Sequence, residues 1–385
     1  MTTLATPLDE AMSGDDAHVR RTDRGYDATS DRSVCVWLIA GAMAVVAAIA
    51  IGGITRLTES GLSITGWRPI AGILPPRDAT AWNDAYTRYL AIPEAQTVHQ
   101  GITLAAFKQL FWWEWVHRLL ARGVGLVLTL PYFVLLLQGK IRPSLRVRLA
   151  NLPLLAALQG AMGWYMVRSG LAGRNSVSPY RLVAHLSLAL VVFVLAVWTA
   201  ASLSRDVERR LTGRVQRHTS LQSQVVTVGL AFLALVTILS GGFVAGLDAG
   251  RVFNTFPLME GRLIPPGYSA IEGWRNAFEN PIAAQLHHRA LALLTACAVW
   301  SAWAFAERRG MQAAVRRWMR LAALAALAQV VLGIATLLLA VPVYLGVAHQ
   351  IGAVILFTTL LLGATAALDM PLSVTDDVSL RPVAS

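Results

Sequence analysis

Four of the eight histidines occupy matching positions near one end of separate apolar segments, and they form one pair in each half of the sequence: His117 with His185, and His288 with His349. Imidazole nitrogens at matched depth on neighbouring helices can supply both axial ligands of a haem iron. Polar groups at membrane depth are costly and usually mark function. The pattern therefore predicts two haem sites in a membrane protein.

Other uses of these histidines explain the pattern less well. A single intramembrane histidine would be interpreted as a core side chain hydrogen-bonded to a neighbouring helix, but four in two aligned pairs argue against that. Zinc and copper also bind imidazole, yet neither half offers a cysteine or a third histidine as an obvious further ligand. His18, His99 and His218 lie in the N-terminal tail or in predicted loops, and we expect them to be ordinary solvated side chains.

The two halves share an ordered series of motifs, which indicates an internal repeat. In the first half these are Gly52-Gly53, Glu114-Trp115-Val116-His117-Arg118, Gln159-Gly160-Ala161-Met162-Gly163 and Val183-Ala184-His185; in the second they are Gly241-Gly242, Gln285-Leu286-His287-His288-Arg289, Gln329-Val330-Val331-Leu332-Gly333 and Val347-Ala348-His349. The adjacent His287 and His288 point about 100° apart on a helix. The alignment of the two His-Arg pairs favours His288 as the ligand.

The residues beside the histidines distinguish the halves. Glu114, three residues before His117, corresponds to Gln285 in the second half. A carboxyl group beside a haem can move protons or stabilise a cationic intermediate, whereas an amide cannot titrate. The difference suggests that the second half holds a permanent haem and the first performs chemistry, unless Glu114 is only an interfacial residue. Arg118 and Arg289 follow the ligands, where they could pair with haem propionates or simply extend to the interface.

The composition is that of a polytopic membrane protein. Of the 385 residues, 55% are hydrophobic and 14% are charged, and the mean hydropathy is +0.54. Because ~20 apolar residues are enough to cross a bilayer, the sequence predicts eight spans, four in each half. They lie near Val34–Ile54, Val116–Leu137, Leu149–Val167, Leu182–Leu203, Val225–Ala245, Leu286–Phe305, Leu321–Ala340 and Tyr344–Leu368.

The basic residues follow this topology. The net charge of +11 would suit nucleic-acid binding, but many of the 33 Lys and Arg residues cluster in the N-terminal tail and in the short connections after the second, fourth and sixth spans, while the other connections carry theirs more thinly over longer stretches. The positive-inside rule then places both termini in the cytoplasm and the four histidines toward the outer face. We therefore expect no nucleic-acid partner.

The expected fold is all-α, with eight transmembrane helices in two pseudo-symmetric four-helix bundles related by an axis along the membrane normal. The expected segments are a disordered cytoplasmic tail over 1–33, an N-terminal bundle over 34–203, a cytoplasmic linker over 204–224, a C-terminal bundle over 225–368 and a cytoplasmic tail over 369–385. The longest external connections, about Thr55–Trp115 and Gly246–Gln285, are expected to contain short interfacial helices that cap the haem sites.

Three stretches resemble the haem A synthase family. They are Gly52–Ser63 followed by Trp67-Arg68-Pro69 and Gly72–Pro76, then Glu114–Arg118, then Phe253–Met259. The resemblance extends from about the first span to the last. It implies conversion of haem O to haem A by oxidation of the C8 methyl group to a formyl group, through two hydroxylations and loss of water from a geminal diol. Some bacterial members carry a cysteine pair in the first external loop, and this sequence has none there.

The resemblance also implies roles for the candidate residues. It assigns His288 and His349 to a bound haem b, and His117, His185 and Glu114 to the half that receives haem O. An external electron donor is expected, since the sequence contains no dinucleotide fingerprint or iron–sulfur cysteine cluster. The expected location is the cell inner membrane, with the haem sites toward the periplasm and the helices in contact with membrane lipid. The expected partners are haem O synthase and the assembly of cytochrome oxidase, and a homo-oligomer is a further option.

Two other function classes use the same histidines. A bis-histidine cytochrome b would carry electrons, but both halves would then hold permanent haems and Glu114 would lack a clear role. A haem transporter or chaperone would bind haem without changing its mass. The haem content per chain and the mass of the extracted porphyrin distinguish these classes from an oxidase.

Overall fold

The computed structural model describes residues 28–67, 70–171, 176–212 and 220–368. Its eight long helices are α2 (Ala28–Leu57), α5 (Leu104–Leu137), α6 (Pro143–Leu171), α7 (Pro179–Thr212), α8 (Leu221–Gly246), α10 (Pro281–Arg308), α11 (Ala313–Leu338) and α12 (Val343–Ala367). Most of the predicted N-terminal tail and the whole C-terminal tail lie outside the described residues, together with His18 and His218.

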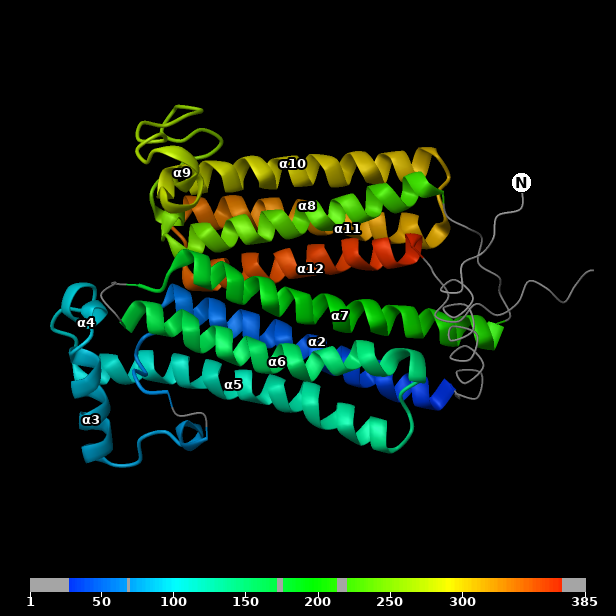
Figure 1. The fold of residues 1–385 in the computed structure, drawn as a ribbon. Helices are drawn as coiled ribbons and strands as arrows, with labels where there is room; N and C mark the ends of the chain where they lie inside the picture. Colours follow the sequence, from blue (N-terminus) through cyan, green and yellow to red (C-terminus); the bar gives the residue numbers. More distant parts are fainter. Residues whose placement is uncertain (1–27, 68–69, 172–175, 213–219, 369–385) are drawn as a thin grey trace, which may run out of the picture.

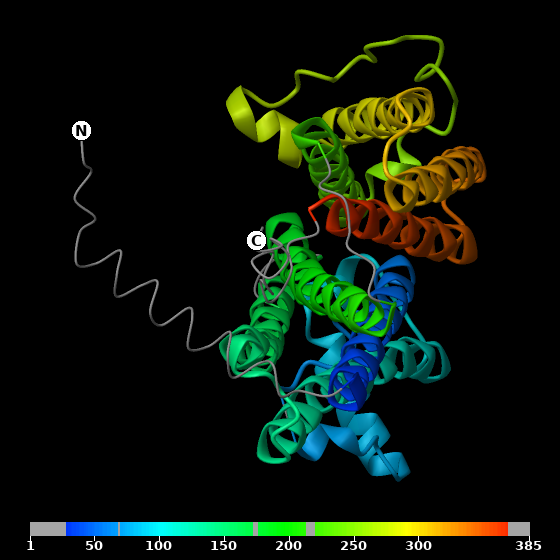
Figure 2. The same ribbon diagram turned by 90° about the vertical axis from the view of Figure 1, so that its right-hand side faces the viewer.

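The long helices form two four-helix bundles of the same design. In the first half, α2 and α6 each contact both α5 and α7; in the second half, α8 and α11 each contact both α10 and α12. Figure 1 shows the two sets one above the other, and Figure 2 shows them nearly end-on. The repeat in the sequence therefore corresponds to a repeat in the packing, and the expected all-α fold is confirmed.

In the described part of the chain, seven helices are long and apolar enough to cross a membrane: α2, α5, α7, α8, α10, α11 and α12. The eighth expected span lies within α6, which does not meet this criterion. Polar residues such as Asn151 and Gln159 lower the hydropathy of α6. Its position in the first bundle nevertheless corresponds to that of α11 in the second, so its place in the membrane stays a prediction.

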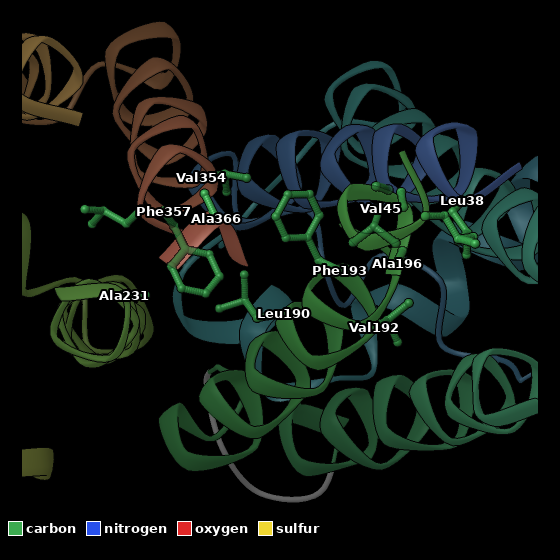
Figure 3. Packing of buried hydrophobic residues seen from close by; sticks show 14 of the residues in the cluster. Leu38, Val45, Leu190, Val192, Phe193, Ala196, Ala231, Val354, Phe357 and Ala366 are labelled. Atoms are coloured by element: carbon green, nitrogen blue, oxygen red, sulfur yellow. The ribbon is translucent and has the colours of Figure 1, made fainter. Parts of the chain in front are cut away.

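The two bundles join through α2 and α7 on one side and α8 and α12 on the other. Figure 3 shows Leu190 and Phe193 of α7 near Val354 and Phe357 of α12 in one apolar cluster. Between helices in a bilayer such side chains associate through close van der Waals packing, since the surrounding lipid is equally apolar. Polar contacts cross the same junction as well. The Gln350 side-chain amide donates to the Ile49 carbonyl at 3.0 Å, and Arg205 donates to the Thr365 hydroxyl at 3.1 Å.

A buried charge network ties the helix ends opposite the histidines. Arg142 is only 1% exposed. Its guanidinium donates to both carboxylate oxygens of Asp31 and to Asp206 Oδ2 at 3.0 Å. The sequence indicated Arg142 only as one basic residue of the connection after the second span. The network also explains why α2 begins before Val34 and why α7 continues to Thr212, into the expected linker.

At the histidine end, two long connections extend beyond the helices. The first, over 58–103, contains α3 (Ala79–Leu90) and α4 (Pro93–Thr97), and the second, over 247–280, contains α9 (Asn276–Glu279). Both lie at the same end of the molecule in Figure 1. The expectation of short helices in these connections is confirmed.

Ion pairs join the end of α2 and the first connection to the second connection. An Arg56 nitrogen lies 2.6 Å from an Asp248 oxygen, and an Arg251 nitrogen lies 3.6 Å from a Glu59 oxygen. Arg56 and Glu59 belong to the first motif of the resemblance, and Asp248 and Arg251 lie just before the Phe253–Met259 motif. The two motifs are therefore neighbours in space.

Candidate haem centres

In the second bundle, His288 of α10 and His349 of α12 face each other. Their ring centres are 6.5 Å apart and the ring planes are perpendicular. A bond from a metal to an imidazole nitrogen is about 2 Å long, and the ring centre lies roughly 1 Å behind that nitrogen. Two imidazoles on opposite sides of one metal would therefore have centres about 6 Å apart. The observed pair fits bis-histidine binding of a haem iron.

The neighbouring His287 has a different environment. Its Nε2 atom is 3.0 Å from the Tyr268 hydroxyl, and the two rings meet edge to face with centres 5.7 Å apart. Tyr268 belongs to the outer connection. The structure thus directs His287 toward that connection, while His288 pairs with His349.

In the first bundle, His117 of α5 and His185 of α7 occupy the corresponding positions. The Nδ1 atoms of both rings are buried, and neither has a hydrogen-bond partner among the described residues. The structure thus places the four histidines that the sequence singled out at equivalent positions in the two bundles.

Each histidine packs against a glycine of a neighbouring helix. A methyl group built on Gly52, Gly163, Gly241 or Gly333 would lie 2.9–3.2 Å from the Cε1 atom of His117, His185, His288 or His349 respectively. A side chain at these positions would displace the imidazole. The glycines appear in the sequence as repeat markers, and their role becomes visible only when the helices are packed. They leave room for the rings beside the backbone, as a planar group bound between two histidines requires.

In each bundle a glutamine links two neighbouring helices, α6 to α7 in the first and α11 to α12 in the second. The Gln159 amide nitrogen donates to the His185 carbonyl at 3.1 Å, and that of Gln329 donates to the His349 carbonyl at 2.9 Å. In the second bundle this nitrogen lies 3.0 Å from His349 Nδ1 as well. These amides hold α7 and α12 in register with their neighbours. The sequence showed the two glutamines only as matching members of the repeat.

Glu114 is buried beside His117 and holds the first outer connection. It is 2% exposed. One carboxylate oxygen accepts from the Ser63 hydroxyl at 2.7 Å and from the Ile64 N–H at 2.6 Å. The other accepts from the Arg118 Nε and Nη2 atoms at 3.0 and 2.6 Å. Arg118 also donates to the Ile64 carbonyl at 2.8 Å. Glu114 is therefore no exposed residue at the helix mouth.

The equivalent pair of the second bundle binds its connection in another way. The Gln285 amide donates to the Phe253 carbonyl at 3.0 Å, and Arg289 donates to the Phe253 and Thr255 carbonyls, both at 2.8 Å. This connection presents carbonyl acceptors, whereas the first presents donors to Glu114. The change from Glu to Gln between the halves thus matches the polarity of the backbone that each side chain meets.

Comparison with known proteins identifies the family of this chain. The family model described as cytochrome oxidase assembly protein, COX15-CtaA, matches residues 35–361. A heme A synthase of Nitrosomonas eutropha is 43% identical over 329 residues, covering 85% of this chain and 92% of that protein. The chain belongs to the haem A synthase family. Further members are the heme A synthases of Azorhizobium caulinodans, 44% identical over 88% of this chain and 95% of theirs, and of Maricaulis maris, 41% identical over 89% and 98%.

In this member of the haem A synthase family, the first outer connection contains a second buried acidic group. Glu94 of α4 is 5% exposed and lies 3.4 Å from the Tyr89 hydroxyl. That hydroxyl is 2.5 Å from His99 Nδ1, and His99 Nε2 is 3.5 Å from Glu59. The expectation of a solvated His99 is wrong, because α3 and α4 fold over the ring and supply hydrogen-bond partners. Sequence periodicity over so short a helix as α4 gave no signal of this.

Burial, together with the nearby Glu114 carboxylate, raises the pKa of Glu94 to about 8. In an unfolded chain a glutamate has a pKa of about 4.3. As the pH rises from about 4.3 to 8, the unfolded chain loses this proton while the folded protein retains it, so the free energy of unfolding falls. We therefore expect Glu94→Gln, which cannot ionise, to raise the melting temperature of the detergent-solubilised protein at pH 8 relative to wild type, and to change it little at pH 5.

The matched control is Glu272→Gln, which alters an exposed glutamate of the other outer connection. It should shift the melting temperature by the same small amount at both pH values. Equal melting temperatures of wild type and Glu94→Gln at pH 8 would show that Glu94 ionises without cost in the folded protein.

Proposed function

We propose that this chain oxidises the C8 methyl group of haem O to a formyl group and so makes haem A for cytochrome oxidase. Two hydroxylations would give a geminal diol that loses water. Relatives named heme A synthase, 41–44% identical over most of the chain, support this activity. The observation that carries it is that equivalent histidines pack against glycines in both bundles, while among the described residues the buried Glu114 of the first bundle stands where the second has Gln285.

The proposal assigns different roles to the two halves. His288 and His349 bind a resident haem b, and His117, His185 and Glu114 belong to the half that receives haem O. The ring separation of 6.5 Å supports the first assignment. Haem iron supplies the redox chemistry when bound. The chain's own residues hold the porphyrins, orient them and handle protons.

Glu114 is placed to act on protons and charge next to the substrate. Its carboxylate accepts four hydrogen bonds and lies on the same helix as His117. A fixed negative charge can stabilise positive charge that develops on the methyl carbon as it is oxidised. The same group can accept a proton released in that step.

Arg118 and Arg289 are proposed to face the haem propionates at the outer ends of the two sites. Both guanidiniums already bind carbonyls of the outer connections. The Arg289 Nε atom is buried and has no hydrogen-bond partner among the described residues. A carboxylate is the acceptor that pairs best with such a donor.

The proposed setting is the cell inner membrane, with both termini in the cytoplasm and both haem sites toward the periplasm. The seven apolar helices support a membrane location. Haem O carries a long farnesyl tail, so it would reach the first bundle from the lipid. Haem O synthase would supply it, an external donor would supply electrons, and assembly into a homo-oligomer is compatible with this scheme.

Cysteine labelling tests the orientation. In a variant with Cys35 and Cys297 replaced by serine, Asn83→Cys on exposed α3 should react with a membrane-impermeant maleimide on intact spheroplasts. Glu208→Cys near the end of α7 should react only after lysis, since basic connections stay inside. Both positions are exposed in the structure. The opposite labelling pattern would invert the topology.

Haem analysis tests the activity. The chain expressed beside a haem O synthase should yield extracted porphyrin with the mass of haem A. A cytochrome b or a haem carrier would leave haem O unchanged in mass. Haem O as the sole product, with the protein folded and its b-type spectrum present, would contradict the proposed function.

A further inference from the structure

The two bundles present the Nδ1 atoms of their histidines to different surroundings. His288 Nδ1 lies 2.8 Å from the Ser240 hydroxyl, and His349 Nδ1 lies 3.0 Å from the Gln329 amide nitrogen. The Nδ1 atoms of His117 and His185 are buried without a hydrogen-bond partner in the described ranges. In the second bundle both Nδ1 atoms therefore have a polar neighbour, and in the first neither does.

A second contact of Ser240 favours one direction for its hydrogen bond with His288. The Ser240 hydroxyl donates to the Thr237 carbonyl at 2.7 Å. A serine hydroxyl has only one hydrogen, so toward His288 it can only accept. With this assignment the His288 Nδ1 atom carries the ring proton. Its Nε2 atom keeps a free lone pair, which is the form of histidine that binds iron.

The repeat explains why His117 lacks this contact. Gly241-Gly242 aligns with Gly52-Gly53, so Ser240 aligns with Ile51. Gly52 and Gly241 contact His117 and His288 in the same way, at 3.0 Å from Cε1. The backbones therefore match at this point, and the difference is the side chain alone. An isoleucine cannot accept a hydrogen bond from the ring.

We propose that Ser240 is a positioning residue that fixes His288 in its iron-binding tautomer, and that Ile51 leaves His117 unfixed so that the first bundle can release its porphyrin. This inference rests on the proposed function. A resident haem must stay bound, whereas a substrate must leave after each turnover. Outer hydrogen-bond partners of a ligating histidine typically change metal affinity by about 10–100-fold, which is enough to separate the two behaviours.

The first test compares Ser240→Ala with Ser240→Thr in the purified full-length protein. Dissociation of haem b is followed by its transfer to apomyoglobin, and the midpoint potential is measured by redox titration. Ser240→Ala should release haem b about ten-fold faster or more. Its midpoint potential should rise, because loss of the Ser240 oxygen weakens the hydrogen bonding at Nδ1 and makes the ring a weaker donor to ferric iron. Ser240→Thr keeps the hydroxyl and should restore both values.

The reciprocal test adds the hydroxyl to the first bundle. Ile51→Ser, loaded with haem O, should release it more slowly to apomyoglobin than wild type. Ile51→Val also shortens the side chain but adds no hydroxyl, so it should release haem O at the wild-type rate or faster. Equal release from Ile51→Ser and Ile51→Val would contradict the proposal.

The outcomes separate this inference from the haem assignment. Wild-type dissociation and potential in Ser240→Ala, with the b-type spectrum still lost in His288→Ala, would overturn the role of Ser240 and leave the assignment intact. Ser240→Thr behaving like Ser240→Ala would show that packing, not the hydroxyl, is responsible. A full spectrum in His288→Ala would instead overturn the assignment itself.

Discussion

The His288→Ala and His349→Ala variants are each expected to lose most of the low-spin b-type absorption of the purified protein, whereas His287→Ala keeps it. The first two rings face each other with centres 6.5 Å apart, as two ligands of one iron require. Loss of either ring leaves the iron with one axial protein ligand. His287 contacts Tyr268 in the outer connection instead, so its removal leaves both ligands in place.

Visible spectra of oxidised and dithionite-reduced protein check this expectation, with haem content per chain measured on the same samples. His287→Ala is a close control because it removes the same side chain from the adjacent residue. A normal spectrum from His288→Ala, with loss in His287→Ala, would show that the two His-Arg motifs do not correspond.

The helices could be predicted from the sequence, but their ends could not. The apolar runs located all eight long helices because a bilayer-spanning segment must be apolar over about 20 residues. The ends depend on polar contacts that hydropathy does not report. Helix α5 begins at Leu104, where the Thr103 side chain accepts from the Ala106 N–H, well before the apolar run. Asp206 extends α7 by pairing with Arg142, 64 residues away in the chain.

The candidate ligands could be predicted because their type and repeat spacing carry the signal. The residues that orient these ligands could not be predicted from the sequence. Ser240 is one of many hydroxyl side chains in apolar helices, and only packing brings it 2.8 Å from a residue 48 positions away. The same holds for Ser63, which meets Glu114 across 51 positions. Local periodicity contains no information on such contacts.

The division of labour between the bundles predicts a large effect at Glu114. The Glu114→Gln variant copies the second bundle's Gln285, so it should keep the resident b-type spectrum. Formation of haem A should fall by about 100-fold or more, because an amide neither accepts the proton nor offsets charge on the oxidised methyl carbon. Haem O or its singly hydroxylated product should accumulate, as measured by mass analysis of porphyrins extracted from cells that also express haem O synthase.

The structure raises a competing explanation for such a loss, since Glu114 also anchors the outer connection through Ser63 and Ile64. Ser63→Ala separates the two roles. It removes one anchoring hydrogen bond, worth about 1.5–3 kcal/mol when the acceptor is charged, but leaves the carboxylate beside His117. If Glu114 acts chemically, Ser63→Ala should retain far more haem A formation than Glu114→Gln. Equal losses in the two variants would mean that the reaction needs the outer connection rather than the carboxylate. Wild-type haem A formation in Glu114→Gln would contradict the assignment of the first bundle as the reactive one.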